Sequence, residues 1–440
     1  MAAVGTADRV LALVIKEVLR LCGYIEYEGT STAGTTTSLT DAANLRVPTA
    51  QANSITGKFY WMFSGTGIGQ QPEIITYGSV GVGTWSPTLA SPAADTGWCI
   101  CKIRPQRAID AIAEETRKAR RKQAIEFLDE SVMTNNLLGY YPTFEHWESG
   151  ASSAPDGFTL GGSGAAVARE STIVAQGEYS VKVTAGGGAV GTLTRTLPTE
   201  LNHLIKGQSL QLLGMIAENV AADLTVRVAV VSADGTTTNT DRAGTLTGNR
   251  WEELEDISTA SISIPDPVRS VALSTRTAVS AVTYADDLFL GGPYLLDYPL
   301  PFQAIGIGMT ILMETAYRSR IFTRELKYGA DWIVGRRGVP ETIGSLRQIH
   351  FLRPLPSARH LRMTLYREPD VVTSFSANVE PTPSWLAHAA AVRLMGQENI
   401  EPESPAAFRL SGLKAELKRL EGTSEGDVMK DKPIVWFETR

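Results

Sequence analysis

Histidine and cysteine are scarce in this chain of 440 residues, which contains five His and three Cys. Few histidines mean few side chains that can act as general bases near neutral pH, so an enzyme is not favoured. Three cysteines are an odd number, and a chain of this length can build its own core, so a disulfide framework is not expected. Cys99 and Cys101 have no further Cys or nearby His to complete four ligands, so zinc is not expected either.

Long apolar runs are also missing. The longest apolar stretch, residues 10–21, is interrupted by Lys16, Glu17 and Arg20 and falls short of the ~20 apolar residues that cross a bilayer. The N-terminus lacks a cationic start followed by an apolar run and a small-residue cleavage site, so no signal peptide is expected. These absences predict that the protein does not insert into a membrane.

Glycine is abundant, and the charges nearly balance. The 41 Lys and Arg residues against 47 Asp and Glu residues give a net charge of -6, which excludes a basic surface over the whole protein. Any site for a nucleic acid must therefore be local. The 40 Gly residues favour turns and strands, and the chain length predicts two or three domains.

Apolar periodicity divides the chain into three parts. Residues 8–22 have the spacing of an amphipathic helix, and a second helix is expected from Pro105 to about residue 134. After residue 294 the pattern predicts a sheet, then helices near 384–395 and 405–420. The middle part holds short alternating runs between glycine-rich turns, which is typical of a β-sandwich. The strands expected there are 179–184, 210–216, 224–231, 252–259, 269–274 and 283–290.

Two similar phrases flank the sandwich segment, residues 137–142 before it and 295–301 after it. A sandwich whose ends emerge side by side can be inserted into a host loop at little entropic cost. We therefore predict a multidomain α+β fold, in which a split α+β body carries an inserted all-β jelly-roll sandwich. The expected parts are 1–139 and 297–440 for the split body and 143–293 for the sandwich.

Five fragments of the sandwich segment follow one another in a characteristic order: FEHW at 144–147, PDGF at 155–158, GEYSVKV at 177–183, RWE at 250–252 and ADDLFL at 285–290. In this order they resemble the jelly rolls of carbohydrate-binding modules. The resemblance implies a structural Ca²⁺ held by Glu145 together with Asp286 or Asp287, because hard oxygen ligands would join the two ends of the domain. The alternative is that these residues are surface carboxylates at strand ends.

The same resemblance raises the question of a glycan ligand. A pyranose ring presents an apolar face that stacks on exposed aromatic side chains. The candidates are Trp147, Trp251 and Tyr284. The alternative is that all three are core aromatics and that the sandwich is adhesive or merely decorative.

Stretches outside the sandwich form a second group: residues 28–39, 65–70, 87–97, 361–369 and 385–391. They resemble structural proteins of tailed bacteriophages. The resemblance implies a virion protein assembled in the host cytoplasm, placed in the neck or tail next to portal, adaptor or tail proteins. We expect a homo-oligomeric ring, held by the helix of residues 8–22 and the C-terminal helices.

The strongest local charge is a basic run of five residues in the second predicted helix. A helix distributes such a run over most of its circumference, and nearby Glu residues can neutralise part of it. In a ring, this surface could instead face an acidic partner or the phosphates of genomic DNA in the channel, without reading bases. The run consists of Arg117, Lys118, Arg120, Arg121 and Lys122.

No catalytic constellation is found in the sequence. The glycine run at 65–69 lacks the third glycine of a dinucleotide fingerprint, and no phosphate loop, metal helix or nucleophile elbow is present. His350 and His360 lie in predicted strands, where packing is the more common role. We therefore expect no enzyme and no cofactor beyond the implied Ca²⁺.

Two functions are compatible with these patterns. The first is a structural virion protein, a ring-forming neck, collar or head-to-tail connector component whose jelly roll projects outward. The alternative is a glycan-binding adhesin or a host-attachment module like those of tail fibres, which would contact surface glycans. A polysaccharide-degrading enzyme would need an acid and base pair that the sequence does not reveal.

Overall fold

The computed structural model describes residues 10–41, 43–45, 54–78, 82–86, 96–139, 141–254, 262–301, 303–336, 347–398, 400–423, 429 and 432–437. The chain forms two compact units, each built from two separate stretches of sequence. Unit 1 comprises residues 1–126 and 366–432, and unit 2 comprises residues 127–365 and 433–440. Within the described residues, no helix is long and apolar enough to cross a membrane.

The helices of unit 1 share one apolar core. Their buried faces meet around Trp61, whose Nε1 donates a hydrogen bond to the carbonyl oxygen of Ala12 at 3.1 Å. The predicted first helix and the two predicted C-terminal helices are confirmed. The helical elements of this unit are α1 (Leu11–Cys22), α2 (Gln106–Ala119), η3 (Arg120–Gln123), α4 (Pro383–Gly396) and α5 (Pro405–Glu421).

The second predicted helix is shorter than expected, and its predicted extension to about residue 134 is wrong. Helix α2 ends at Ala119, and after η3 the chain forms strand β8 (Ile125–Asp129). Arg120 has φ 33° and ψ -114°, which lies outside the helical region, so the helix cannot continue through it. Beyond this break, partly buried and exposed side chains alternate along β8, as they do in a strand with one covered face.

Two small antiparallel sheets complete unit 1. One has the strand order β1-β7-β4 and the other the order β2-β3-β6-β5. Buried Trp98 on β7 donates from Nε1 to Oδ2 of Asp41 at 3.1 Å, which satisfies its one polar group. The strands are β1 (Ile25–Thr30), β2 (Ala33–Thr35), β3 (Ser38–Thr40), β4 (Phe59–Met62), β5 (Thr76–Gly78), β6 (Val82–Thr84) and β7 (Gly97–Cys101). Residues 87–95, within one of the phage-like stretches, lie outside the described residues.

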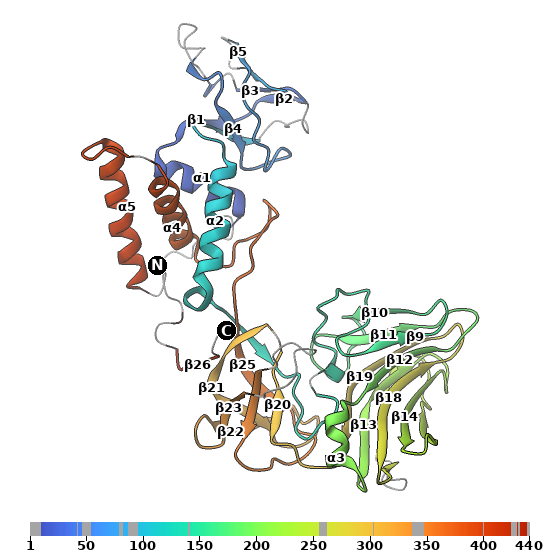
Figure 1. Cartoon of the computed structure of the whole chain (residues 1–440). Helices are drawn as coiled ribbons and strands as arrows, with labels where there is room; N and C mark the ends of the chain where they lie inside the picture. Colours follow the sequence, from blue (N-terminus) through green and yellow to red (C-terminus); the bar gives the residue numbers. More distant parts are fainter. Residues whose placement is uncertain are drawn as a thin grey trace. The chain divides into compact units, whose positions relative to one another are not determined.

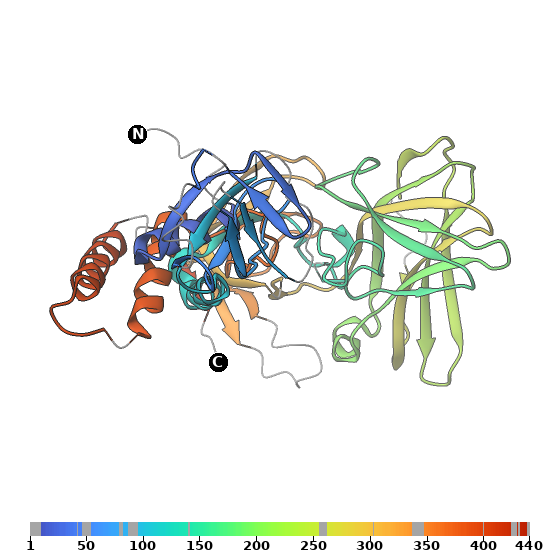
Figure 2. The same ribbon diagram turned by 90° about the horizontal axis from the view of Figure 1, so that it is seen from above.

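The sandwich of unit 2 consists of two antiparallel sheets, which can be followed in green and yellow in Figures 1 and 2. The first sheet has the order β10-β11-β19-β13-β16, with β17 paired to β13, and the second has the order β15-β14-β18-β12-β9. Apolar side chains from both sheets fill the space between them, because alternate residues of each strand point inward.

All six strands expected in this segment are present, although residues 255–259 of the fourth lie outside the described part. The sandwich strands are β9 (Thr159–Gly161), β10 (Ala166–Glu170), β11 (Ser180–Thr184), β12 (Gly191–Thr196), β13 (Ser209–Glu218), β14 (Leu224–Ser232), β15 (Thr237–Ala243), β16 (Arg250–Glu253), β17 (Ile262–Ser263), β18 (Val268–Thr277) and β19 (Val282–Gly291). Short helical turns η4 (Tyr141–Thr143), η5 (Thr199–Leu201) and α3 (Asn202–Ile205) connect them.

The remainder of unit 2, which we call the adjoining sheets, is also built from strands. One sheet has the order β22-β21-β25-β8, with β26 paired to β21, and the other has the order β20-β24-β23. Their common core includes the fully buried Trp332 and Phe351. The strands are β20 (Asp297–Pro299), β21 (Ala304–Glu314), β22 (Phe322–Lys327), β23 (Trp332–Arg336), β24 (Arg347–Phe351), β25 (Leu361–Arg367) and β26 (Ile434–Trp436).

Asn136 joins the two ends of the sandwich. Its Nδ2 donates to the carbonyl oxygen of Leu288 at 3.0 Å, and its Oδ1 accepts from the backbone N–H groups of Leu138 and Leu290 at 3.2 and 3.1 Å. The N–H of Leu137 also donates to the carbonyl oxygen of Leu290 at 2.8 Å. The chain therefore enters and leaves the sandwich side by side, as an insertion requires.

Asn135, next to Asn136 at the entry to the sandwich, binds residues of the adjoining sheets. Its Nδ2 donates to the carbonyl oxygen of Leu355 at 2.9 Å, and its Oδ1 accepts from the N–H of Leu295 at 2.8 Å. The hydroxyl of Tyr298 on β20 donates to the same Oδ1 at 3.1 Å. Sandwich and adjoining sheets are thus held together by buried and partly buried hydrogen bonds, and they form one compact unit.

The boundaries of the two compact units differ from the predicted domain boundaries. We predicted that residues 1–139 and 297–440 would form one body, whereas residues 127–139 and 297–365 belong to unit 2 with the sandwich. The physical reason is the paired asparagine junction, together with strand β8, which adds to β25 in the adjoining sheets. The fold is multidomain and rich in strands; a split α+β body remains a prediction.

We predict that Asn136→Ala lowers the free energy of unfolding of unit 2 by about 2–4 kcal/mol, because it leaves buried backbone donors and an acceptor without partners. Asn239→Ala, at an exposed position on strand β15, is the matched control and should change stability little. Thermal unfolding of both variants, followed by tryptophan fluorescence, checks this. Equal stabilities of the two variants would contradict the role given to the junction.

Candidate functional site

The first sheet of the sandwich carries a row of side chains on its outward face. Strand pairing places Trp251 of β16 opposite Ala217 of β13, Ala217 opposite Tyr284 of β19, and Tyr284 opposite Lys182 of β11. The neighbouring residues Ile216, Ala285, Val181 and Val183 belong to the sandwich core. Because successive side chains of a strand point to opposite faces, the row points away from that core.

The members of this row differ in exposure. Trp251 is partly exposed, whereas Tyr284 is only 6% exposed. The ammonium nitrogen of Lys182 lies 6.0 Å from the centre of the Tyr284 ring. Burial, and then the charge of Glu170, raise the pKa of the Tyr284 hydroxyl, so it stays a neutral hydrogen-bonding group at physiological pH. Ala217 between the aromatics is only 1% exposed, so the middle of the row is covered and Trp251 is its accessible aromatic.

The third aromatic candidate, Trp147, is not part of this face. It is only 8% exposed, lies in the sandwich core, and donates from Nε1 to the carbonyl oxygen of Phe144 at 2.6 Å. A sugar could not stack on its ring without opening the core. The prediction of Trp147 as a glycan contact is therefore corrected, and its alternative as a core aromatic describes it.

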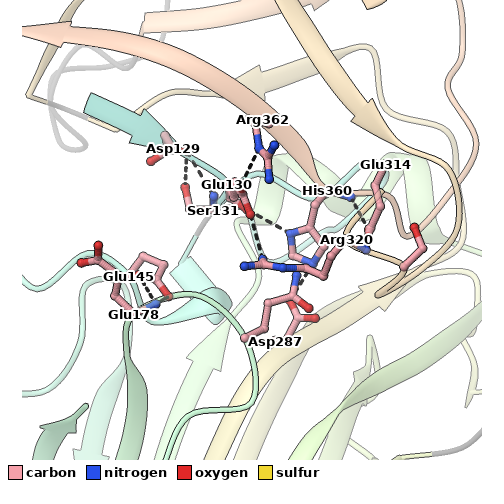
Figure 3. A network of polar contacts seen from close by, with 12 residues as sticks. Asp129, Glu130, Ser131, Glu145, Glu178, Asp287, Glu314, Arg320, His360 and Arg362 are labelled. Carbon is pink, nitrogen blue, oxygen red and sulfur yellow. Dashed lines mark hydrogen bonds and ion pairs between the residues drawn. The ribbon is translucent and has the colours of Figure 1, made fainter. Parts of the chain in front are cut away.

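A cavity of about 530 Å³ lies beside this face, where the sandwich meets the adjoining sheets. Many of its walls are charged, and Figure 3 shows how these side chains gather from several elements. The lining comprises Phe127, Leu128, Asp129, Glu130, Thr143, Glu145, His146, Gln176, Gly177, Glu178, Tyr179, Asp286, Asp287, Gln303, Arg320 and His360.

Three ion pairs stabilise the walls of the cavity. Oδ2 of Asp129 lies 2.8 Å from Nε2 of His146, and Oε2 of Glu130 accepts from Arg320 at 2.8 Å. Asp287 and His360, each 1% exposed, form the third pair, with Oδ1 of Asp287 at 2.9 Å from Nε2 of His360.

His360 carries a proton on both ring nitrogens in this arrangement. Its Nδ1 faces the carbonyl oxygen of Glu130 at 2.9 Å, while its Nε2 faces the carboxylate of Asp287. Burial alone would lower the pKa of His360, but the charge of Asp287 and these two acceptors raise the pKa to about 9. Buried Glu314 adds to this effect, and its Oε2 accepts from the backbone N–H of His360 at 3.2 Å.

The pKa values of two carboxyl groups on the sandwich side of the cavity are also raised, which for an acid favours the neutral form. Burial raises the pKa of Glu145 to about 7, although backbone N–H groups of Tyr179 and Glu178 oppose the shift. Burial, and then the charge of Asp287, raise the pKa of Asp286 well above its usual range. A site that destabilises its own carboxylates in this way is stabilised by an added positive charge.

The expected calcium site can be tested on these contacts. Calcium takes six to eight oxygen ligands. Here, however, the carboxylate of Glu145 accepts from the N–H groups of Glu178 and Tyr179, and Oδ2 of Asp286 accepts from those of Ala175 and Gln176. Donor N–H groups thus stand where calcium would need oxygen atoms.

Asp287 does not complete such a site, because it faces His360. Among the described residues, no group of three or more His, Cys, Asp or Glu side chains is arranged to hold a metal. These contacts do not favour Ca²⁺, and its binding by Glu145 with Asp286 or Asp287 stays a prediction. The alternative of surface carboxylates is wrong for Asp286 and Asp287, because both are buried.

The predicted basic run lies in unit 1, away from the cavity residues in the sequence. Arg117 and Lys118 end α2, and the other three residues form η3. Lys118 pairs with Glu115 at 3.0 Å, and Lys122 pairs with Glu421 of α5 at 3.6 Å. Part of the run is therefore neutralised within the unit, and a partner or DNA-facing role for Arg117, Lys118, Arg120, Arg121 and Lys122 remains a prediction.

The sequence pointed to only part of this site. The sequence resemblance indicates Glu145 with Asp286 or Asp287 as a metal site, and the strand pattern favours packing for His360. Asp129, Glu130 and Arg320 were missed, because they lie in strand ends and loops that carry no motif. The one available signal was the pair of adjacent aspartates in a strand that otherwise reads as buried, since a buried carboxylate requires a partner.

Comparisons with known proteins give only a remote likeness. No family model matches the sequence, and no curated protein matches it. Among solved structures, the C-terminal family 22 carbohydrate-binding module of Clostridium thermocellum Xyn10B is 17% identical, with a TM-score of 0.27, over 35% of this chain and 92% of that chain. TmCBM61, solved in complex with β-1,4-galactotriose, is 15% identical, with a TM-score of 0.25, over 34% of this chain and 94% of that chain.

The enzymatically active domain of bacteriophage CBA120 tailspike protein 4 is 12% identical, with a TM-score of 0.25, over 31% of this chain and 19% of that chain. TM-scores at this level do not carry an argument about function. The function must therefore be argued from the contacts within this chain.

We predict that unit 2 loses stability as the pH rises towards about 9, because the folded pKa of His360 lies above its usual value of 6.5. The stabilisation by its charge is complete below about pH 6.5 and is lost as the pH rises through about 9. His360→Gln should be less stable than the parent protein at pH 6, and the difference should shrink by pH 10. Melting temperatures across this range, with His203→Gln at an exposed site as the control, check this. A constant difference would contradict a charged His360.

Proposed function

We propose that this protein binds glycans through the outward face of the sheet β10-β11-β19-β13-β16. The single observation that carries the proposal is the row in which Trp251, Tyr284 and Lys182 stand in register on that face. Sugar rings stack on aromatic side chains through their apolar face and hydrogen-bond to polar groups around them.

The spacing of the row suits a sugar ring. Neighbouring strands lie about 4.8 Å apart, so Trp251 and Tyr284, on strands two apart, are separated by about 10 Å. Small Ala217 lies between them. Lys182 lies one strand beyond Tyr284, about 14 Å from Trp251, so its ammonium group could donate to a second sugar residue along the row, with Glu170 of the next strand as an acceptor.

A host-attachment role on a phage particle is the setting we propose for this binding. It agrees with the phage-like stretches in unit 1 and in the last third of the chain. Placement in the neck, contact with portal, adaptor or tail proteins, and location in the virion remain predictions, as does the absence of enzymatic activity.

We predict that Trp251→Ala weakens glycan binding at least about tenfold while leaving the melting temperature unchanged, because a partly exposed ring contributes stacking and little core packing. The full-length chain is screened on an array of bacterial surface polysaccharides, and the strongest ligand is then titrated by calorimetry. Tyr294→Ala removes an aromatic ring that is 65% exposed but lies outside the row, and it serves as the control. An array without any bound glycan would reject the proposed function.

A second candidate function, a ring-forming structural component, is favoured by one observation on α5. Phe408 on this helix is 70% exposed, while only Leu413 and Leu420 of the helix are buried. Such a helix face suits contact with another copy of the chain. Helix α1, predicted as a second contact surface, instead buries its apolar side chains in the core of unit 1.

We expect a homo-oligomer in which Phe408→Ser shifts the population towards monomer, because the substitution removes the exposed apolar anchor. Mass photometry of the two proteins at equal concentration measures the shift. Tyr328→Ser, at a residue that is 39% exposed, controls for general loss of exposed aromatic surface. A parent protein that is monomeric at every concentration would exclude the ring.

A further inference from the structure

The cavity continues the outward face on which the proposed glycan row lies. Asp286 follows two residues after Tyr284 on β19, so the two side chains share this face at a distance of about 7 Å along the strand. Further along, Phe289 packs with Leu213 against Met133 and Ala358 of the adjoining part of unit 2. The adjoining part therefore closes the end of the face, and the cavity occupies the corner.

The charges that line this cavity do not balance. Each of its three cations is paired with one carboxylate: His146 with Asp129, Arg320 with Glu130 and His360 with Asp287. Within the described lining, Glu145, Glu178 and Asp286 remain as carboxylates in excess of these pairs. The pKa values of Glu145 and Asp286 are raised, so the corner has more carboxyl groups than cations, and a positively charged ligand would favour the ionised form of these groups.

Two carboxylate oxygens in this corner have no hydrogen-bond donor among the described residues. They are Oδ1 of Asp286 and Oδ2 of Asp287, and both residues are only 1% exposed. A buried carboxylate oxygen without a donor costs free energy, so an incoming donor gains more here than at an exposed site. The other oxygen of Asp286 already accepts from two backbone N–H groups, which fixes the direction of the free one.

The number and kind of acceptors favour an ammonium group over a metal ion. A primary ammonium has three donors and needs only a few acceptors, whereas Ca²⁺ needs six to eight oxygens. Backbone N–H groups of residues 175–179 surround Asp286 and Glu145, and they would repel a metal ion placed among them. A small cation with directed hydrogens can instead approach the two free oxygens alone.

The other walls of the cavity can take the rest of such a ligand. Phe127, Leu128 and Tyr179 supply apolar surface, and the side chain of Leu128 is 66% exposed at the rim. A volume of about 530 Å³ is within the range of pockets that hold a small organic ligand. Hydroxyl groups of a sugar can meet Gln176, Gln303 and Glu178 around it.

We infer that the cavity binds an amino sugar, with its protonated amine at Asp286 and Asp287 and its ring against Tyr179 and Phe127. This inference rests on the proposed glycan function, and it adds the class of sugar. The row runs across the strands and Asp286 lies further along β19, so a glycan on Trp251 and Tyr284 would turn at Tyr284 to place a residue with a free amine in the corner.

The test compares two oligosaccharides that differ at the nitrogen, which is a protonated amine in one and a neutral N-acetyl amide in the other. Chitosan tetrasaccharide, with free amines, and chitotetraose, with N-acetyl groups, are titrated calorimetrically into the full-length chain at about pH 6, where a primary amine is protonated. We expect chitosan tetrasaccharide to bind at least about tenfold tighter. This comparison uses the parent protein and does not depend on any variant folding.

Asp286→Asn then tests whether the preference for the free amine arises at Asp286. The asparagine keeps an oxygen for the N–H groups of Ala175 and Gln176 but removes the charge. It should reduce binding of the amine form to the level of the acetylated form, while Glu200→Gln, at an exposed position, should change neither. Trp251→Ala should weaken both.

Each other outcome decides a different point. Equal binding of the two oligosaccharides, abolished by Trp251→Ala, would overturn the amino-sugar inference and leave glycan binding in place. No binding of either, together with a blank glycan array, would reject both proposals. Binding of Ca²⁺ that requires Asp286 and blocks the amine would make the cavity a metal site. Binding of tetralysine in place of chitosan would assign the cavity to a basic peptide.

Discussion

The buried pair of Asp287 and His360 is the interaction on which the arrangement of unit 2 depends. Each side chain is 1% exposed, and each would be strongly unfavourable without the other. Asp287 lies on the last strand of the sandwich, and His360 directly precedes β25 of the adjoining sheets. Separation of the two parts would leave Asp287 without its cation and His360 with only Glu314 of its own sheet nearby, so the pair favours the docked arrangement. The asparagine junction then fixes the register of that docking.

This docking also determines which surface is open to a ligand. The outward face of the first sandwich sheet would otherwise be open along its whole length. Phe289 and Leu213 cover one end of it against Met133 and Ala358, and the polar cavity forms where this apolar contact stops. One end of the face therefore serves packing, and the aromatic row lies further along it. A function at this face is inseparable from the insertion, because the same strand serves both.

The sequence predicted the parts of this fold better than their assembly. Alternation was enough for β13, β14 and β19, since one side of each strand is buried in the sandwich. The end of α2 was missed because no Gly or Pro stands at position 120 to signal a helix end. Only the backbone angles of Arg120 show that the helix stops there. The boundary of unit 2 was missed because Asn135 and Asn136 act through partners about 150–230 positions away in sequence, which no local pattern reveals.

The candidate site shows the same limit for a more specific reason. Two adjacent aspartates in a strand should point to opposite faces, so the sequence offered either one as a ligand of a single ion. The structure separates their roles through the backbone: Asp287 has φ 52°, and the pairing of β13 with β19 is irregular at this point. Asp and Asn accept this left-handed conformation better than most residues. The irregularity turns Asp287 towards His360 while Asp286 stays on the ligand face, so one carboxylate fixes the docking and the next remains available to a ligand.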